Sequence, residues 1–433
     1  MRIGIVGSGI AGLASAWLLA REHEVVLFEA NDYLGGHTHT HDISTEDGDY
    51  RIDSGFIVHN RENYPLLTRL FDELGVATQP TTMSFSVRNM ASGLEYNAAT
   101  LDTLFSQRRN LLSPRFLGML RDIMRFYRLA PAILAEDGEG PSLEDYLAVH
   151  RFGDAFRDDH LVPMASALWS SSPSAIRKFP MRFLVRFMHN HCMLTRDRRP
   201  QWRVVRGGSR RYVEALQARW RVDARLRTPV LGVARDEEGV DVRTRDGIER
   251  FDQVVLACHS DQALALLVDP DPREREILGA ITYQANNTVL HTDTSLLPRS
   301  PKTWAAWNTS VLGEADLACT VSYCMNLLQG ISSPQTFIVT LNQSDAIDPA
   351  KILRRMAYRH PQYTDGAVAA QQRRGEIQGL RRTWYAGAYW GWGFHEDGMR
   401  SAVDVAAKLG VRWKPGIAAC APVDRHLLQW VPA

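Results

Sequence analysis

The fold is decided by the stretch Gly7-Ser8-Gly9-Ile10-Ala11-Gly12, which joins two regular patterns. Residues 3–6 before it form a short apolar run typical of a buried strand, and residues 13–20 after it are rich in helix-forming side chains. A second buried-strand pattern, residues 25–28, follows a polar break and ends at Glu29. The order of strand, glycine-rich turn, helix and strand predicts a unit that binds a dinucleotide.

The residue types in this unit suit that chemistry. Gly7, Gly9 and Gly12 permit a tight turn and let backbone N–H groups approach a pyrophosphate, which the start of the following helix stabilises. Glu29 stands 22 residues after Gly7, where an acid can accept hydrogen bonds from a ribose. Glycine-rich turns also precede helices in proteins without nucleotides, so the prediction depends on the whole order of elements and not on the glycines alone.

The continuation of the chain separates FAD from NAD. After Ala30 comes Leu34-Gly35-Gly36-His37-Thr38, and past a hairpin expected to turn at Asp47-Gly48 comes Asp53-Ser54-Gly55-Phe56. This pattern resembles the flavin-containing amine oxidase and phytoene desaturase superfamily, whose members carry an acid, Gly-Gly-Arg and then Asp-x-Gly. The resemblance implies FAD, with the second glycine pair along its pyrophosphate and ribityl chain. His37 replaces the usual arginine and, being mostly neutral at pH 7, makes that contact electrostatically weaker.

The resemblance recurs in three later segments. The first is Gly207-Gly208-Ser209, before a helix predicted over residues 211–220; the second holds Val230, whose counterpart pairs its backbone with adenine, and a predicted strand at 253–258. The third runs from Thr383 to Ala388 and from Gly391 to Met399, and precedes a helix predicted over residues 400–409. Its counterparts bracket the flavin, although Ala388 cannot replace the acid that usually contacts the ribityl chain. The residues predicted to bind FAD are Gly7, Gly9, Ile10, Ala11, Gly12, Glu29, Ala30, Gly35, Gly36, His37, Thr38, Gly55, Phe56, Val230, Ala257, Gly387, Phe394, Gly398 and Met399.

These segments imply a fold of the α/β plus α+β class with two interleaved domains. A Rossmann-like FAD-binding domain is expected from residues 1–80, 200–261 and 381–433, and a substrate domain from residues 81–199 and 262–380. No second GxGxxG motif follows a strand, so no NAD domain is expected. Oxygen, a quinone or a carrier protein would then reoxidise the flavin.

Candidate catalytic residues lie in two places. Residues 282–291 are predicted to form a strand, in which amine oxidases generally place a lysine beside the flavin; Asn287 occupies the corresponding position. A neutral amide cannot supply that positive charge, which argues against ordinary amine oxidation. His395 and Glu396 are candidate acid–base residues, and the alternative for Glu396 is an acid favoured by a helix N-terminus.

The region between the cofactor segments is apolar and rich in arginine. Residues 101–135 place apolar side chains at helical spacing and intersperse six arginines, a composition repeated over residues 179–194. The favoured interpretation is a helix packed inward, and the alternative is an interfacial helix that meets anionic lipid or surrounds an acyl tunnel. No cluster of carboxylates suggests a polyamine, so an apolar pocket is expected.

The runs Gly35-Gly36-His37-Thr38-His39-Thr40 and Trp392-Gly393-Phe394-His395-Glu396-Asp397-Gly398 resemble one subgroup in particular. Its members are bacterial flavoproteins encoded near cyclopropane-fatty-acid synthases. The resemblance implies dehydrogenation of a fatty acyl or other lipid-like substrate by hydride transfer to flavin N5, and a functional link to such a synthase. A redox-neutral double-bond isomerase, an amine oxidase and a non-catalytic partner subunit remain as alternatives.

Composition excludes several other classes. Fifty basic residues offset 49 acidic ones in the 433-residue chain, so no strong field indicates nucleic-acid binding. The five cysteines form no CxxC pair, which is typical of reduced thiols. His37, His39 and His41 alternate, but no acid or cysteine is clearly placed with them and no metal site is predicted. The protein is expected in the cytoplasm or peripheral to the inner membrane face.

Overall fold

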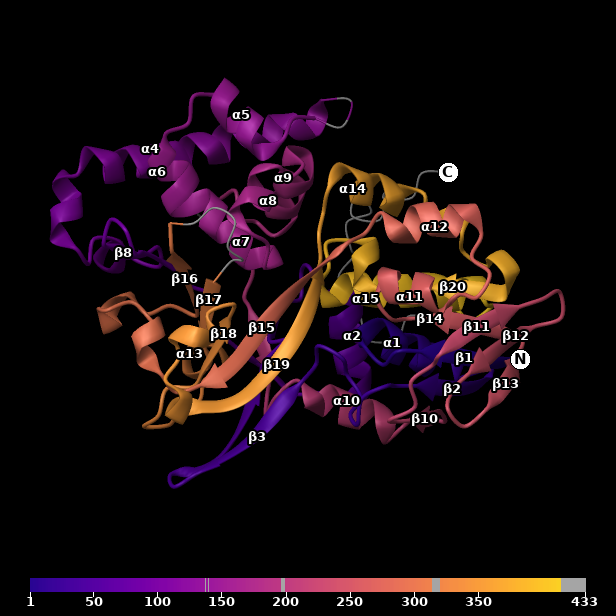
Figure 1. The fold of residues 1–433 in the computed structure, drawn as a ribbon. Helices are drawn as coiled ribbons and strands as arrows, with labels where there is room; N and C mark the ends of the chain where they lie inside the picture. The colour runs from indigo at the N-terminus through magenta and orange to yellow at the C-terminus, as the bar shows by residue number, and fades with distance from the viewer. Residues whose placement is uncertain (137, 139, 196–198, 314–319, 414–433) are drawn as a thin grey trace.

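The computed structural model describes residues 1–136, 138, 140–195, 199–313 and 320–413. The end of the predicted FAD-binding domain, residues 414–433, and two of the five cysteines, Cys319 and Cys420, lie outside the described residues. One half of the molecule contains the N-terminal sheet, and the other contains a larger sheet with most of the helices of residues 101–190 (Figure 1).

A five-stranded parallel sheet forms the first half, in the order β10-β2-β1-β14-β20. Its strands are β1 (Arg2–Val6), β2 (Glu24–Phe28), β10 (Asp223–Arg225), β14 (Gln253–Leu256) and β20 (Thr383–Tyr385). The apolar side chains of β1 are buried, which explains its uninterrupted hydrophobic run. Helices α1 (Ile10–Leu19) and α15 (His395–Lys408) pack together in the same core, where residue 398 must be glycine because a Cβ there would lie 2.6 Å from Ile10 Cγ2.

Three small antiparallel sheets surround the parallel one. They are the hairpin β3 (Thr40–Thr45) and β4 (Gly48–Asp53), the sheet of β5 (Val58–His59), β9 (Arg203–Val205) and β6 (Thr78–Pro80), and the sheet of β11 (Gly232–Arg235), β12 (Val240–Arg243) and β13 (Ile248–Phe251). Thr45 lies opposite Gly48, so the first hairpin turns at Glu46 and Asp47, one residue earlier than predicted. Gly48 has a φ of +138°, which only glycine adopts readily.

The second half is built on a seven-stranded sheet in the order β19-β15-β18-β17-β16-β7-β8. Its strands are β7 (Phe85–Asn89), β8 (Leu94–Asn97), β15 (Tyr283–His291), β16 (Trp307–Val311), β17 (Thr320–Cys324), β18 (Ile338–Leu341) and β19 (Ile352–Pro361). Strands from both parts of the predicted substrate domain, residues 81–199 and 262–380, therefore pair in one sheet. The exact domain boundaries remain a prediction. The long strands β15 and β19 lie at one edge of this sheet and extend toward the first half of the molecule (Figure 1).

Most helices cover the second half. Those of the first insertion are α3 (Leu101–Leu104), η1 (Arg108–Leu112), α4 (Pro114–Leu129), η2 (Ala130–Ala135), α5 (Leu143–Val149), α6 (Asp154–Phe156), η3 (Arg157–Leu161), α7 (Val162–Trp169), α8 (Pro173–Arg177) and α9 (Met181–Asn190). The remaining α-helices are α2 (Pro65–Leu74), α10 (Arg210–Gln217), α11 (Ser260–Leu266), α12 (Pro272–Gly279), α13 (Met325–Gln329) and α14 (Asp365–Gln372). The short 3-10 turns are η4 (Thr294–Leu296), η5 (Pro301–Thr303), η6 (Ser344–Ala346), η7 (Pro349–Lys351), η8 (Arg374–Glu376), η9 (Leu380–Arg382) and η10 (Ala388–Trp390).

The helical pattern at residues 101–135 is not one helix. Ser113 accepts a hydrogen bond from the backbone N–H of Phe116 and Pro114 occupies the first turn, so a new helix, α4, begins there. Phe116, Met119 and Phe126 on α4 are buried, as the favoured inward-packing interpretation requires. No helix of the described residues is long and apolar enough to cross a bilayer.

The last helix begins five residues earlier than predicted, at His395 instead of Arg400. The carboxylate of Asp397 accepts hydrogen bonds from the backbone N–H groups of Trp392 and Phe394, at 3.0 and 3.1 Å, and so holds the first turn in place. Gly398 lies inside this helix, at the point where a Cβ would come within 2.6 Å of Ile10 on α1.

A buried ion pair connects three elements in the first half of the molecule. Arg235 on β11 and Glu274 on α12 have fully buried side chains, with Nη1 and Oε1 2.6 Å apart, and the Tyr385 hydroxyl on β20 donates to the same carboxylate. Burial by itself would raise the pKa of Glu274, but the hydrogen bonds from Arg235 and Tyr385 outweigh it and lower the pKa. Arg235 and Glu274 are therefore both charged in the folded protein.

We expect Glu274→Gln to lower the free energy of unfolding by about 3 kcal/mol, because Arg235 would stay buried without its counter-charge. Because the pKa of Glu274 is lowered in the folded protein, the wild type gains this stability above the ordinary glutamate pKa and loses it as the pH falls below that value. Urea unfolding at several pH values measures both effects. Glu276→Gln, which breaks an exposed pair with Arg373, should leave the unfolding midpoint unchanged; equal midpoints for the two variants would contradict the assignment.

Candidate active site

The predicted cofactor residues meet at one edge of the parallel sheet. Gly7, Glu29, Ala257 and Gly387 directly follow, or lie within two residues of, the ends of β1, β2, β14 and β20. Because these strands are parallel, their carboxyl ends lie at the same edge, where open α/β sheets bind their ligands. The order of the strands in the sheet therefore brings together segments that are far apart in the sequence.

Two glycine segments lie against each other at this edge. A Cβ on Gly12 would lie 1.9 Å from the carbonyl oxygen of Gly7, and a Cβ on Gly36 would lie 3.1 Å from Gly9 Cα. A Cβ on Gly9, in contrast, would meet nothing within 4 Å. The backbone is therefore closely packed around an open space at Gly9, as a phosphate-binding turn requires.

The first turn of α1 provides hydrogen-bond donors without acceptors. No side chain caps this helix at Gly9 and no acid lies in its first turn, so its free backbone N–H groups form a site for an anion. Glu29 is buried close by, and its carboxylate accepts hydrogen bonds from the backbone N–H groups of Ser8 and Asn31, at 3.0 and 2.8 Å. These residues fit the pyrophosphate and ribose of a dinucleotide.

Asp53 joins two of the recurring motifs, a role that the sequence analysis missed. Its buried carboxylate accepts hydrogen bonds from the Thr40 hydroxyl and from the backbone N–H and hydroxyl of Ser209. Burial raises the pKa of Asp53 to about 6. A Cβ on Gly208 would lie 2.5 Å from Thr40 Cγ2, so the Gly-Gly-Ser segment packs tightly against the start of β3. The sequence signal for this contact was the partial match of the Asp53 segment and of the Gly207-Gly208-Ser209 segment to the family motifs.

His395 lies at the start of α15 and is held on two sides. Its ring stacks on Phe56, with 3.6 Å between ring centroids, and its Nε2 lies 3.0 Å from the hydroxyl of Thr38. That hydroxyl is in turn 2.5 Å from the hydroxyl of Tyr212. Burial lowers the pKa of His395 well below its ordinary value, so the imidazole is neutral at pH 7.

Glu396 holds a neighbouring helix. Its two carboxylate oxygens accept hydrogen bonds from the backbone N–H groups of Leu66 and Leu67, both at 3.0 Å, in the first turn of α2. Burial raises the pKa of Glu396 to about 8 in spite of these bonds. Glu396 lies in the first turn of α15, and its carboxylate accepts N–H groups at the N-terminus of a second helix, α2.

A cluster of aromatic and imidazole rings surrounds His37; Tyr358 is buried and the histidines are partly buried. The centroid of its ring lies 4.8 Å from that of Tyr358, 5.4 Å from that of His360 and 6.1 Å from that of His259. Burial lowers the pKa of His37 to about 4, and its Nε2 is buried without a hydrogen-bond partner among the described residues. Within that part of the chain, no three His, Cys, Asp or Glu side chains are placed to hold a metal.

The structure does not bring Asn287 to this cluster. Side chains alternate along β15, and the side chain of Asn287 is exposed while that of Asn286 is buried. Asn286 Nδ2 lies 3.1 Å from Nδ1 of His360, so Asn286 is the residue that faces the imidazoles. Strand register placed the two asparagines on opposite sides, and no motif distinguished them.

The other predicted residues lie around the same edge. Phe394 precedes α15, Met399 is fully buried on it, and the backbone N–H of Gly387 donates to the hydroxyl of Ser401. Val230 stands just before β11 and is partly buried. Ala30 is exposed, directly after Glu29.

An aromatic wall connects the start of α15 to the helices of the second half. The ring of Phe187 on α9 stacks on Phe394 and lies edge-on to Trp392, with centroids 5.3 and 5.9 Å apart. Trp169 packs on Phe187, and its indole N–H donates to the carbonyl of Trp392. Phe187 and Trp169 are buried while Trp392 and Phe394 stay partly exposed, so the start of α15 meets apolar side chains on this side.

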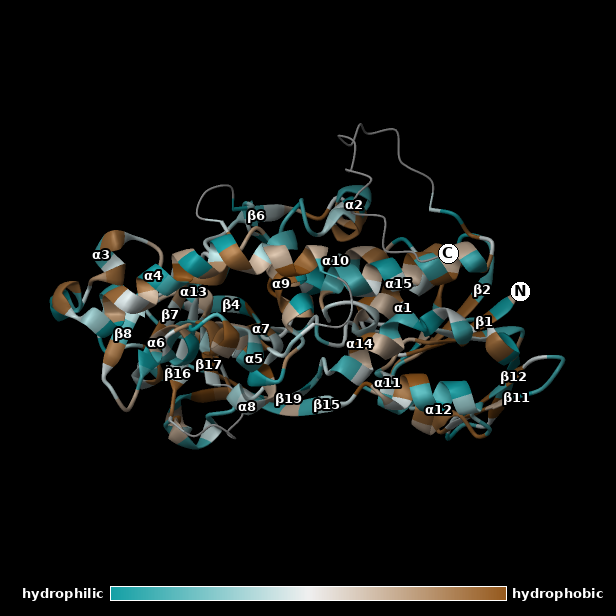
Figure 2. Ribbon diagram, turned by 90° about the horizontal axis from the view of Figure 1, so that it is seen from above, coloured by the Kyte–Doolittle hydropathy of each residue, from teal (hydrophilic) through white to brown (hydrophobic). Residues whose placement is uncertain are grey.

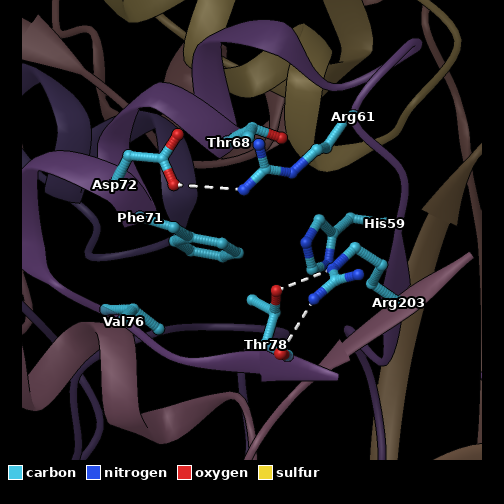
Figure 3. Close-up of a pocket in the computed structure, with 8 residues that line it drawn as sticks. All are labelled: His59, Arg61, Thr68, Phe71, Asp72, Val76, Thr78 and Arg203. Carbon is cyan, nitrogen blue, oxygen red and sulfur yellow. Dashed lines mark hydrogen bonds and ion pairs between the residues drawn. The ribbon is translucent and has the colours of Figure 1, made fainter. Parts of the chain in front are cut away.

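A polar cavity of about 210 Å³ lies behind α2, lined by His59, Arg61, Thr68, Phe71, Asp72, Val76, Thr78 and Arg203 (Figure 3). Arg61 faces Asp72 at 3.5 Å, and Arg203 donates to the hydroxyl of Thr78 at 2.8 Å. The ring of Phe71 also packs against Tyr212, so it separates this cavity from the residues around His395.

The two glycines of the turn provide a matched pair of variants. We expect Gly12→Ala to lower the melting temperature of the flavin-free protein, because its methyl group would collide with a backbone carbonyl. Gly9→Ala should leave that temperature unchanged but weaken flavin binding at least tenfold, because a methyl group keeps a phosphate from the backbone. Flavin-free melting curves and flavin titrations test this. A Gly9→Ala protein with wild-type flavin affinity would contradict it.

Known structures share this architecture. Among them are a fatty acid isomerase from P. acnes described as CLA-producing (17% identity, TM-score 0.65, 94% of this chain and 98% of that one) and a cyclohexylamine oxidase from Brevibacterium oxydans (16% identity, TM-score 0.67, 94% and 99%). At these identities the likeness shows the fold alone, and it confirms the predicted fold class.

Sequence relatives match over shorter segments. A 4,4'-diapolycopen-4-al dehydrogenase from Metabacillus indicus is 43% identical over 79 residues, 18% of this chain. The chain matches only 15% of the length of that protein and 9% of the length of a second curated relative.

The family model of the flavin-containing amine oxidoreductases matches residues 10–327. The match begins at the first turn of α1 and extends over the Asp53 segment, the Gly-Gly-Ser turn and most of the seven-stranded sheet. The uncapped helix, the open space at Gly9 and the buried Glu29 fit the FAD that this family carries. The chain therefore belongs to the flavin-containing amine oxidoreductase family, so it is an oxidoreductase, and FAD is the cofactor that this family implies.

Proposed function

We propose that the enzyme dehydrogenates a fatty acyl chain or another lipid-like substrate. The observation that carries this proposal is the apolar, aromatic wall beside the start of α15, where no carboxylate is free among the described residues. Such a surface favours a hydrocarbon chain over a charged amine, because burying an ammonium group without a counter-charge is costly.

The two acids nearest this wall are already engaged. Glu396 accepts backbone N–H groups of α2, and Asp397 accepts those of Trp392 and Phe394. Asp397 also lies 3.1 Å from a guanidinium nitrogen of Arg400. Neither carboxylate is available to bind an amine, so this arrangement supports a neutral substrate.

The residues of the chain have distinct roles in this proposal. The N-terminus of α1 holds the pyrophosphate and Glu29 the ribose, while the N-terminus of α15 stabilises negative charge that develops near it. Bound FAD would accept a hydride from the substrate at N5. The wall of Phe187, Trp392 and Phe394 would exclude water from the reacting carbon.

His395 is our candidate for proton transfer. It is neutral, and its Nε2 faces the hydroxyls of Thr38 and Tyr212, which can pass a proton along the chain of hydrogen bonds. Glu396 is a positioning residue, because it joins the start of α15 to α2. Asn287, with its exposed side chain, is not part of this proposal; Asn286 orients His360.

The resemblances add two finer points. The names of two similar proteins specify a fatty acid and 4,4'-diapolycopen-4-al as what they act on, which is compatible with an acyl substrate here. We further propose a functional link to cyclopropane-fatty-acid synthases, with a methyl-branched or cyclopropane-bearing acyl chain as substrate, and a location in the cytoplasm.

Anaerobic mixing with acyl phospholipids tests the reaction. We expect the visible absorbance of the bound flavin to bleach, and mass spectrometry to find a product lighter by two hydrogen atoms. Branched and cyclopropane-bearing chains should bleach it faster than straight chains if the link to the synthase holds.

Other outcomes would replace the proposal. Turnover that requires prior reduction of the flavin and leaves the product mass unchanged would identify an isomerase. Peroxide release with amines would identify an amine oxidase. No bleaching with any lipid, and no turnover by the isolated chain, would favour a non-catalytic partner subunit.

Variants at 395 and 396 separate the two proposed roles. His395→Gln should slow flavin reduction by about 100-fold while changing the melting temperature little, because proton transfer by a positioned group contributes about that factor. Glu396→Gln should lower the free energy of unfolding by about 1–3 kcal/mol, because an N–H group of α2 loses its acceptor. Stopped-flow reduction and thermal melting give both values. A large rate loss for Glu396→Gln at unchanged stability would reverse the assignment.

A further inference from the structure

Exposed apolar side chains gather on one segment of the second half. Of the thirteen large hydrophobic side chains that are exposed in the described chain, five lie between residues 101 and 124. Leu112 is 87% exposed, more than any other of the thirteen. The five are Leu101, Leu111, Leu112, Leu117 and Met124. Such a concentration is unusual on a surface that meets only water.

Helix α4 orders part of this surface into a stripe. Leu117, Arg121, Met124 and Arg128 are exposed at spacings of four, three and four residues, so they follow one side of the helix over roughly 16 Å. The opposite side of α4 carries the buried Phe116, Met119 and Phe126. The outer side therefore alternates apolar and cationic groups and has no packing partner in the described chain.

The charge of the segment is one-sided. Residues 101–128 contain six arginines and two aspartates. Asp102 already pairs with Arg108 and Lys302, and Asp122 is buried against Arg125. Arg121 lies 3.7 Å from Asp122 and Arg115 lies 2.8 Å from Asp159, whereas no acidic side chain of the described residues pairs with Arg109 or Arg128. Positive charge thus remains available on the exposed side.

We propose that this face, formed by α3, η1 and the outer side of α4, docks the protein on an anionic lipid surface. Leucine and methionine side chains would enter the interface, and arginines would pair with phosphates, as in helices that lie in the plane of a membrane. A second copy of the chain fits less well, because it would bring arginines against arginines.

The inference goes beyond the proposed reaction and does not depend on it. The face lies at the end of the molecule away from the parallel sheet, where apolar segments of α3 are visible in Figure 2. Vesicle binding can therefore be measured with the flavin bound and without turnover. Failure of the binding would leave the proposed chemistry intact, and failure of the chemistry would leave the binding intact.

Co-sedimentation of the flavin-loaded protein with lipid vesicles tests the proposal. We expect binding to phosphatidylcholine vesicles that contain phosphatidylglycerol, weaker binding in high salt, and little binding to phosphatidylcholine alone. Arg121→Ala with Arg128→Ala should weaken binding about fivefold per arginine. Leu112→Ser with Leu117→Ser and Met124→Ser should weaken it at least tenfold.

The matched control is Ile248→Ser with Val268→Ser, which changes two exposed side chains outside this face (65% and 63% exposed) and should bind like the wild type. Flavin absorbance and melting curves check that every variant is folded. The proposal is overturned if the wild type ignores anionic vesicles, or if the variants bind as tightly as the wild type. It is equally overturned if light scattering finds a wild-type dimer that these variants dissociate.

Discussion

The first turn of α1 is the constraint on which the rest of the structure depends. Its backbone N–H groups have no acceptor on any side chain that caps the helix, and they point to an open space at Gly9. Helix and strand come this close only because residue 12 has no side chain. The N–H groups of such a helix end need an acceptor, and the phosphates of a bound dinucleotide would supply one.

The surrounding elements keep that edge assembled with buried carboxylates. Glu29 binds the turn, Asp53 joins the hairpin to α10, and Glu396 joins α15 to α2. Each accepts backbone N–H groups in a buried setting, where an unpaired donor would cost free energy. Because these acids accept hydrogen bonds from the backbone, none of them is left with an unpaired charge beside the aromatic rings at the start of α15.

Much of this could be predicted from short-range patterns. The strand, turn, helix and acid of residues 3–29 follow from local rules of propensity and spacing, and the strand at 283–291 matches its predicted range almost residue for residue. Local rules failed where a distant contact decided. Helix α15 starts early because Asp397 accepts a hydrogen bond from the backbone N–H of Phe394, and register with β19 places Asn286, not Asn287, beside His360.

The sequence by itself determined the nucleotide-binding unit, the FAD family pattern and the apolar, arginine-rich character of the second half, because these depend on residue type and local spacing. Only the tertiary structure decided what each titratable group does. His37, His259 and His360 form one cluster although they come from three distant segments, and Glu396 accepts a hydrogen bond from Leu66, 330 residues earlier in the chain. Burial and hydrogen-bond partners set these roles, and both arise from packing between segments that no local pattern connects.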